Sequence, residues 1–314
     1  MTTTAQPKFR KPRGGQRMEP SGYYWLLYLA PALIFYVVFM AWPLLDSIRL
    51  SLYTGNLHNR SYVGLENFTR LFTDAELSTR YWRAFGHTWY FFLIHLLFQN
   101  ILGLFFAALL THPTLKGRTF YQTVIFLPTT FAVAITGFLW KMLLNPTWIE
   151  SFVNPLGLGF LAKPWLGQES TALTTVSLVS CWQWVGIPTM MFVAALRGIP
   201  EDLTEAGAIE GAKNWQNFFY IKLPLIFPVV GMVTILTFVS NFNAFDVVFA
   251  MEGANAPPNF STDLIGTLFY RTGIAGMHPI GIPDPGMGAT IATVTFLMLM
   301  ICVIPSLKAT QGRD

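Results

Sequence analysis

The sequence predicts an all-α, polytopic membrane protein with six transmembrane helices. Apolar residues make up 53% of the 314 residues and charged residues only 11%, whereas a soluble domain carries about 25% charged residues. A helix of about 20 apolar residues crosses the hydrocarbon core of a bilayer, and the chain contains six runs of that kind. Because these runs are continuous and do not alternate between apolar and polar residues, they exclude a membrane barrel.

The six spans follow from the apolar runs in chain order. The first run is too long for a secretion signal and no small-residue cleavage site clearly follows it, so we expect it to be a helix of the mature protein. Pro31, Pro43, Pro128 and Pro188 lie in or near spans, where neighbouring helices can satisfy the carbonyls that a kink frees. The predicted spans are 22–45, 85–110, 120–140, 171–196, 224–245 and 286–307.

Basic residues in the flanking segments predict the orientation. If the N-terminus is cytoplasmic, 12 of the 20 Lys and Arg residues lie on the cytoplasmic side, in the direction of the positive-inside rule. The sequence thus predicts a cytoplasmic, disordered tail over 1–21, one membrane domain over 22–307 and a cytoplasmic tail over 308–314. Cys181 and Cys302 both fall in apolar runs, where we expect inert core thiols. The formal charge of +4 is small, and no nucleic-acid partner is predicted.

One polar segment interrupts the apolar second half of the chain. Residues 201–223 read EDLTEAGAIEGAKNWQNFFYIKL, and PLIFP follows. Small residues allow another surface to approach the backbone closely, and exposed acids can pair with basic side chains. Four acids alone would favour an ordinary solvated loop, but the spacing of the small residues and Pro224 favour a docking element. We expect a short helix over 201–211, with Gly211 permitting the turn into a second helical stretch.

The order of residues in this segment resembles the EAA loop of the permease subunits of binding-protein-dependent ABC importers. The matching residues run from Glu205-Ala206-Gly207 through Gly211-Ala212 to Phe218, Ile221, Leu223-Pro224 and Pro228. Two positions depart from the usual pattern: Gly207 stands where the family has a second alanine, and Glu210 where aspartate is common. We interpret both as tolerated variation.

Other segments resemble the sugar-type branch of these permeases, which includes maltose, oligosaccharide and glycerol-phosphate permeases. Residues 62–68 read YVGLENF, similar to a recurring segment of that branch, and Pro128, Trp140 and Asn243–Asp246 also match. The usual Gly-Gly-Pro after the fifth span is replaced by residues 253–258, GANAPP. The resemblance covers nearly the whole chain from Tyr24 to Pro305.

The resemblance implies the type I importer permease fold in a bacterial or archaeal plasma membrane. It also implies a second homologous permease subunit forming a heterodimer, two ATPase subunits, and an extracytoplasmic solute-binding protein that delivers a sugar-like solute. The short helix would fit a groove of the ATPase and act as a lever on the fourth and fifth spans. The residues expected to couple to the ATPase are Glu201, Glu205, Ala206, Gly207, Glu210, Gly211, Ala212 and Pro224.

The energy source is expected to lie outside this chain. None of the six spans contains Asp, Glu, Lys or Arg, whereas ion-coupled carriers usually need an ionisable residue or a broken helix at mid-membrane. His95 lies at depth, and we expect it to be neutral and hydrogen-bonded within the bundle. No Gly-Lys dipeptide is present, so a phosphate-binding loop is excluded. The chain is therefore predicted to be no enzyme, with no cofactor and no metal site; an ion-coupled carrier and a structural scaffold are the alternatives.

Polar residues inside the spans predict the solute pathway. His95, Gln99 and Gly103 recur on one helical stripe, and Ser240, Asn243 and Asp246 share another face. Amides and hydroxyls between aromatic rings suit an uncharged polyhydroxylated solute, although amides in spans also act as interhelical hydrogen-bonding groups. The individual solute stays open, glycerol phosphate included. The residues expected to line the pathway are Gln99, Trp182, Gln183, Trp184, Asn241, Phe242, Asn243 and Asp246.

Overall fold

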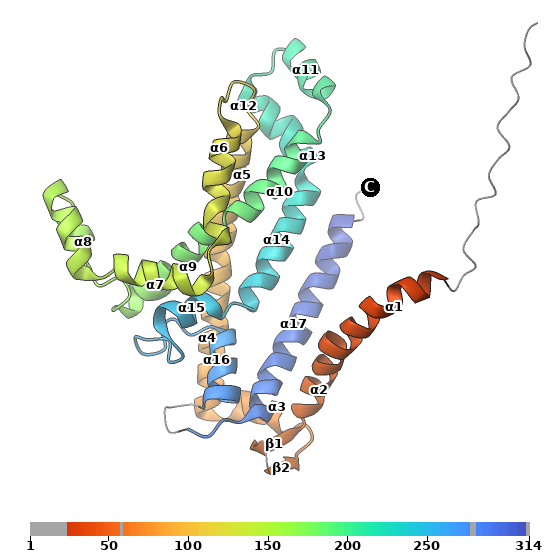
Figure 1. Cartoon of the computed structure of the whole chain (residues 1–314), viewed down its shortest axis with the longest axis vertical. Coiled ribbons are helices and arrows are strands. Elements are labelled where there is room, and N and C mark those ends of the chain that lie inside the picture. The colour runs from red at the N-terminus through yellow and green to blue at the C-terminus, as the bar shows by residue number, and fades with distance from the viewer. Residues whose placement is uncertain (1–23, 57–58, 277–280, 312–314) are drawn as a thin grey trace, which may run out of the picture. The chain divides into compact units, whose positions relative to one another are not determined.

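The computed structural model describes residues 24–56, 59–276 and 281–311, and most of them are helical (Figure 1). The predicted all-α membrane fold is confirmed, with one small hairpin added. The predicted tail over 1–21 lies outside the described residues. The elements are α1 (Tyr24–Tyr36), α2 (Trp42–Leu50), β1 (Tyr53–Asn56), β2 (Asn59–Tyr62), α3 (Glu66–Thr73), α4 (Ala75–Ile94), α5 (Ile101–Leu110), α6 (Arg118–Phe126), α7 (Val133–Leu143), α8 (Pro146–Val153), α9 (Glu169–Trp184), α10 (Gly186–Arg197), α11 (Glu201–Ile209), α12 (Asn214–Gln216), α13 (Leu223–Leu225), α14 (Phe227–Phe242), α15 (Asp246–Glu252), α16 (Ile265–Tyr270) and α17 (Pro285–Gln311).

Short segments of tighter or wider helix join several of these elements. A π-helical turn continues α1 into α2, a second continues α4 into α5, a third joins α12 to α13, and a fourth follows α16. These π-helical segments are Val37–Ala41, His95–Asn100, Asn217–Lys222 and Arg271–Ala275, and the 3-10 turns are Leu127–Thr130, Asn154–Leu156 and Gly159–Leu161.

The chain divides into two compact units at the bond between Asp46 and Ser47, within α2. In the first unit, none of the side chains described over 27–46 is buried, and large apolar ones such as Tyr28 and Phe39 are mostly exposed. A helix with apolar side chains all around it suits a lipid environment. The second unit, Ser47–Asp314, contains the hydrophobic core and every site considered below.

The predicted spans appear as three long helices and three bent pairs. Leu27–Leu50, Ala75–Leu110 and Pro285–Thr310 are each long and apolar enough to cross a membrane. The other three candidates bend by 97° between α6 and α7, by 44° between α9 and α10, and by 67° between α13 and α14. Counting each bent pair as one span gives the six that the sequence predicts.

Proline accounts for the position of each bend. Pro128 stands in the 3-10 turn after α6, Pro188 in the first turn of α10, and Pro228 at the second position of α14. A proline ring removes a backbone donor and clashes with the carbonyl four residues earlier, so the helix breaks or kinks there. After Pro128 the residues Phe131 and Ala132 are extended, which turns α7 away from α6.

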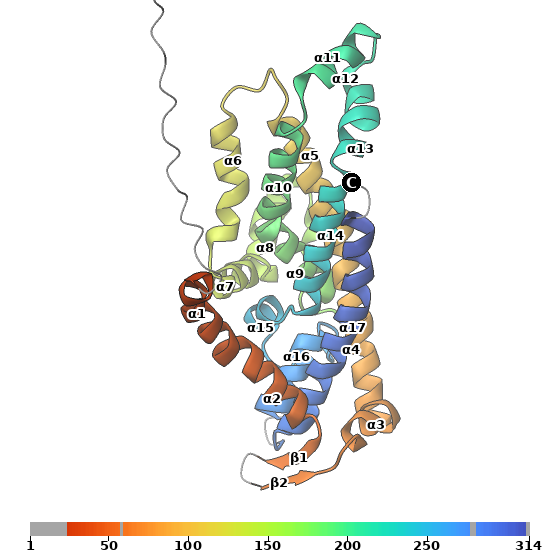
Figure 2. The same ribbon diagram turned by 90° about the vertical axis from the view of Figure 1, so that its right-hand side faces the viewer.

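One end of the second unit is built around a buried asparagine. β1 and β2 pair antiparallel with Tyr53 opposite Tyr62. The side-chain amide of Asn67, in α3, donates to the carbonyls of Ser51 and Tyr53 at 2.9 and 2.8 Å. Gly286 allows α17 to begin against the Tyr53 carbonyl, since a Cβ there would overlap that oxygen. Figures 1 and 2 show the hairpin and α3 at the end of this unit opposite to α11.

A buried ion pair fixes the segment between α15 and α16. The guanidinium of Arg271 lies 2.5 Å from a carboxylate oxygen of Asp263, and both residues are buried. Thr267 donates to the same carboxylate at 2.6 Å, and the Arg271 guanidinium also lies over the ring of Phe260. His87 of α4 donates from Nδ1 to the Asp263 carbonyl at 3.0 Å. The loop is therefore held both internally and against α4.

Breaking this pair should destabilise the fold. In the Arg271→Met variant the Asp263 carboxylate stays buried without its cation, which costs about 3–5 kcal/mol of unfolding free energy. Thermal unfolding in detergent, followed by the reaction of the buried thiol of Cys181 with a dye, measures the effect. Glu76→Gln is the matched control, because Glu76 is exposed in its pair with Arg80 and such pairs contribute about 1 kcal/mol or less. Equal unfolding temperatures for Arg271→Met and the parent would contradict the stabilising role.

Candidate functional site

The segment predicted to dock begins as a regular short helix. α11 covers Glu201–Ile209, with Glu201 and Asp202 in the first turn, where acids interact favourably with the helix dipole. It ends in a Schellman motif: the amide of Gly211 donates to Ala208 and that of Ala212 to Gly207. Gly211 has a φ of +85°, which glycine adopts without strain. The structure thus has the expected helix and the expected turn at Gly211.

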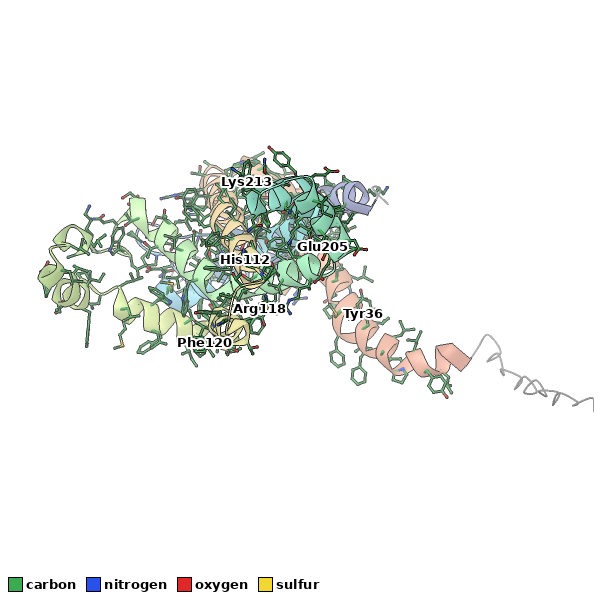
Figure 3. The ribbon with its side chains drawn as sticks, turned by 90° about the horizontal axis from the view of Figure 1, so that it is seen from above. Tyr36, His112, Arg118, Phe120, Glu205 and Lys213 are labelled. Carbon is green, nitrogen blue, oxygen red and sulfur yellow. The ribbon has the colours of Figure 1, made fainter. Side chains whose placement is uncertain are left out.

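α11 projects most of its surface outward. Ile209 is 87% exposed and Leu203 is 43% exposed, and the acidic side chains are exposed as well. Gly207 is the buried residue of α11 and faces the π-helical segment Asn217–Lys222. Figure 3 looks down on this end of the second unit and labels Glu205 and Lys213 there, together with His112 after α5 and Arg118 at the start of α6. Pro224 lies in α13, beyond the turn, and is exposed.

A second feature is a cavity of about 270 Å³ between helices of the same unit. Residues of α4, α7, α9, α10, α14 and α15 contribute to its wall, as does the π-helical turn His95–Asn100. Among the described residues that line it, Asp246 is the single carboxylate and there is no Lys or Arg. The polar residues of the wall are His95, Gln99, Ser180, Thr237, Ser240, Asn241, Asn243 and Asp246.

Two amides of the wall have unused hydrogen-bonding capacity. Gln99 and Asn241 are 6% and 5% exposed. Within the part of the chain that the structure describes, Gln99 Oε1 and Asn241 Nδ2 are buried and have no hydrogen-bond partner. Leaving a buried polar atom unpaired costs about 1–3 kcal/mol. The unpaired acceptor and the unpaired donor thus belong to two side chains of one cavity wall.

His95 is fully engaged with its neighbours. Its Nδ1 lies 2.8 Å from the carbonyl of Phe91, and its Nε2 lies 3.0 Å from the hydroxyl of Ser180. A carbonyl can only accept, so Nδ1 carries the proton, and the neutral ring accepts from Ser180 at Nε2. His95 is buried. This is the arrangement expected for a histidine that is neutral and hydrogen-bonded within the bundle.

Five of the eight residues predicted for the pathway line the cavity. Three of them, Asn241, Asn243 and Asp246, lie where α14 ends at Phe242 and α15 begins at Asp246. The shared face therefore does not come from one continuous helix, as the spacing suggested, but from the break between two helices. The five residues are Gln99, Trp184, Asn241, Asn243 and Asp246.

The other three residues lie outside the wall. Trp182 packs edge-on against Trp140 with ring centres 5.4 Å apart. Gln183 is buried, and its amide donates to the Phe131 carbonyl at 3.0 Å. Phe242 is buried in an aromatic cluster with Trp89 and Phe238.

The stripe of His95, Gln99 and Gly103 is also altered. The π-helical turn His95–Asn100 has a wider repeat than an α-helix, so Gly103 rotates away from the cavity. It faces α10, where a Cβ on Gly103 would lie 3.0 Å from Pro188 Cβ. Gly103 therefore permits close helix packing.

Sequence reasoning missed two polar partners on facing helices. Ser180 of α9 pairs with His95, and Thr237 of α14 lies 3.1 Å from the amide oxygen of Asn100. Their hydroxyls carry no signal in a hydropathy pattern, because Ser and Thr also bond to their own helix backbone. The two serines on α9, Ser177 and Ser180, were the signal in the sequence that could have indicated a polar face on this helix.

Comparison with known proteins gives the same family as the motif. The model of the family described as binding-protein-dependent transport system inner membrane component matches residues 99–310. The lactose transport system permease protein LacF of Rhizobium radiobacter is 29% identical over 293 residues, which cover 92% of this chain and 93% of LacF. The maltose/maltodextrin transport system permease protein MalF of Salmonella typhimurium is 32% identical over 260 residues, or 80% of this chain and 49% of MalF.

Solved structures show the same fold. A bacterial ABC transporter involved in the import of the acidic polysaccharide alginate contains a chain that matches with a TM-score of 0.75 and 21% identity, over 92% of this chain and 96% of that one. The matched family region, 99–310, contains both α11 and most of the cavity wall. The resemblance carried by Glu205-Ala206-Gly207 and the residues after it is thereby confirmed: the chain belongs to the inner membrane components of binding-protein-dependent transport systems.

Proposed function

We propose that this chain is the membrane-spanning permease subunit of an ATP-driven importer for an uncharged sugar or oligosaccharide. Its relatives include permeases named for lactose, for multiple sugars in Streptococcus mutans and for maltose and maltodextrin. The chain itself is not catalytic in this proposal. ATP hydrolysis takes place in separate subunits, and this chain converts their motion into a change of access to the cavity.

The chemistry of the cavity supports a polyhydroxylated solute. Gln99 Oε1 can accept and Asn241 Nδ2 can donate, and a sugar hydroxyl does both. Trp184 and Phe245 also line the wall, and aromatic rings can cover the apolar face of a sugar ring. Of the pathway residues named above, Gln99, Trp184, Asn241 and Asn243 are therefore assigned to solute contact. Trp182, Gln183 and Phe242 would support the wall from behind.

The charge of the wall favours an uncharged solute over an anionic one. The described lining residues include the Asp246 carboxylate and no Lys or Arg. An anion placed there would meet a like charge without a compensating cation, which is unfavourable in a site of low dielectric constant. Glycerol phosphate is therefore disfavoured. The same reasoning separates this chain from the structurally similar alginate transporter, whose solute is described as acidic.

α11 is suited to a groove on an ATPase subunit. Its exposed Leu203 and Ile209 provide apolar contacts, and its acidic residues provide a charged rim. An amphipathic helix laid into an apolar groove is a common mode of recognition, and a basic rim on the groove would complement the acids. The residues assigned to this contact are Glu201, Glu205, Ala206, Glu210 and Ala212, with Gly211 making the turn that presents them.

The observation that carries the proposal is the course of α14. This helix of 16 residues follows the segment that α11 packs on, and its last turn contributes Ser240 and Asn241 to the cavity wall. At 1.5 Å per residue it spans about 24 Å. A force applied at α11 can therefore pass through the bend of 67° before α14 and reach the cavity along that helix. A carrier driven by protons is less favoured, because none of the six predicted spans contains Asp, Glu, Lys or Arg.

The proposed assembly has further members. A second homologous permease would complete the pathway as a heterodimer, two ATPases would bind at the α11 end, and a solute-binding protein would bind at the opposite end. The related alginate transporter is described in complex with a periplasmic protein carrying a pentasaccharide. Placing α11 in the cytoplasm agrees with the Lys and Arg residues near it, such as Arg197, Lys213 and Lys222. The N-terminus would then be cytoplasmic, in the plasma membrane of a bacterium or archaeon.

Reversing one charge on α11 tests the docking role. Glu205→Lys should lower the amount of ATPase that copurifies with the complex by at least about tenfold, because a like charge at a charged interface costs several kcal/mol. The amount of permease in the membrane should stay the same. Glu150→Lys is the matched control, since Glu150 is also exposed but lies on α8. Full ATPase binding and full uptake by Glu205→Lys would defeat the proposal.

Removing one amide of the wall tests the solute contact. Asn241→Ala should raise the KM for sugar uptake by about tenfold in the reconstituted complex, as expected when one buried hydrogen bond to the solute is lost. Gln183→Ala is the control, because Gln183 is also a buried amide but lies outside the wall. It should reduce the yield of folded protein and leave KM unchanged. A parental KM for Asn241→Ala would place solute binding elsewhere.

A further inference from the structure

The junction between α11 and the segment that follows it is unusually close. A Cβ on Gly207 would lie 2.4 Å from Asn217 Oδ1 and 2.7 Å from Ile221 Cδ1. Both distances are far below an ordinary van der Waals contact, so the ends of both side chains would have to shift. Gly207 is therefore the residue that allows α11 to lie directly on the Asn217–Lys222 segment.

Asn217 closes the same junction from the other side. Its side chain is buried, and its Nδ2 donates to the Thr204 carbonyl of α11 at 3.3 Å. The backbone amide of Asn217 donates to the carbonyl of Lys213, and Asn217 is the first residue of the π-helical segment. The carboxamide thus lies on Gly207 and is tied to α11 one turn earlier. We call the contact between Gly207 and Asn217 the seam.

The seam belongs to the main contact between α11 and the helix bundle. Within the described chain, Asn217–Lys222 is the element against which α11 makes its main contacts outside its own turn. The backbone between α11 and this segment passes through Gly211, which has a φ of +85°. Glycine is the most flexible residue of the backbone. Without the seam, α11 could rotate about this connection while α14 stayed in place.

We infer that Gly207 and Asn217 are positioning residues that make α11 and the helix leading into α14 move as one body. This inference rests on the proposed coupling role of α11 and extends it to a specific contact. The resembled motif usually has alanine at position 207. In this chain glycine at that position leaves the space that the Asn217 side chain occupies. A looser seam would let the ATPase complete its cycle without moving the cavity wall.

A double-mutant cycle in the complete complex, reconstituted in liposomes with its ATPases and binding protein, tests the seam. Gly207→Ala should leave ATPase copurification at the parental level and lower the solute imported per ATP hydrolysed by about tenfold, because one added methyl forces the packed side chains apart. Asn217→Ala alone should also lower import per ATP, because it removes the hydrogen bond to Thr204. Gly207→Ala combined with Asn217→Ala should cost less than the two single losses multiplied, since both changes act on the same contact. Gly198→Ala is the matched control, because a Cβ there meets nothing closer than 3.4 Å.

The outcomes separate this inference from the proposed function. Parental import per ATP in Gly207→Ala would overturn the seam while leaving the docking role of Glu205 intact. Losses that simply multiply in the double variant would also overturn it, and so would a failure of Gly207→Ala to assemble with its ATPases. If Glu205→Lys binds ATPase normally, the proposed function fails and not the seam alone.

Discussion

Hydrocarbon provides no hydrogen bonds, so a polar group within a membrane bundle must find its partner on another part of the protein. In this chain, two pairs within the predicted spans meet that constraint: His95 pairs with Ser180 of α9, and Asn100 with Thr237 of α14. Outside the spans, buried Asp263 pairs with Arg271, and Asn67 joins the hairpin to α3. Against this background, the unpaired amide atoms of Gln99 and Asn241 stand out because both belong to the wall of one cavity.

One helix connects the segment under α11 with the cavity. α14 begins after the segment on which α11 lies and ends in the cavity wall, and its start is bent by 67° from the helix before it. A rigid rod with a bend at one end can convert a sideways push into a tilt. In the proposed function, this helix would relate docking to access without a long chain of intervening contacts. The buried face of α14, including Thr237, packs on the π-helical turn between α4 and α5, which would guide such a tilt.

Sequence reasoning recovered the apolar spans, the short helix of α11 and the turn at Gly211, because each depends on local residue type. It named four prolines as places where a kink is tolerated: the chain bends at Pro128 and Pro188, but Pro31 and Pro43 lie in the unbroken span Leu27–Leu50. The angle of each bend depends on what the following helix packs against. The turn at His95–Asn100 removed Gly103 from the predicted stripe, since a π-helical insertion leaves no mark in composition. Gly207 was interpreted as tolerated variation, yet only the fold shows how close Asn217 lies.

The central claim is that the work of transport enters this chain from outside, through α11. The most direct measurement compares two sets of liposomes under a proton or sodium gradient and with enclosed ATP. One set contains this chain alone, and the other contains it with its permease partner, ATPases and binding protein. The account predicts ATP-dependent accumulation of sugar in the complete set and none in the set with the chain alone. Accumulation driven by an ion gradient in liposomes that contain only this chain would contradict it.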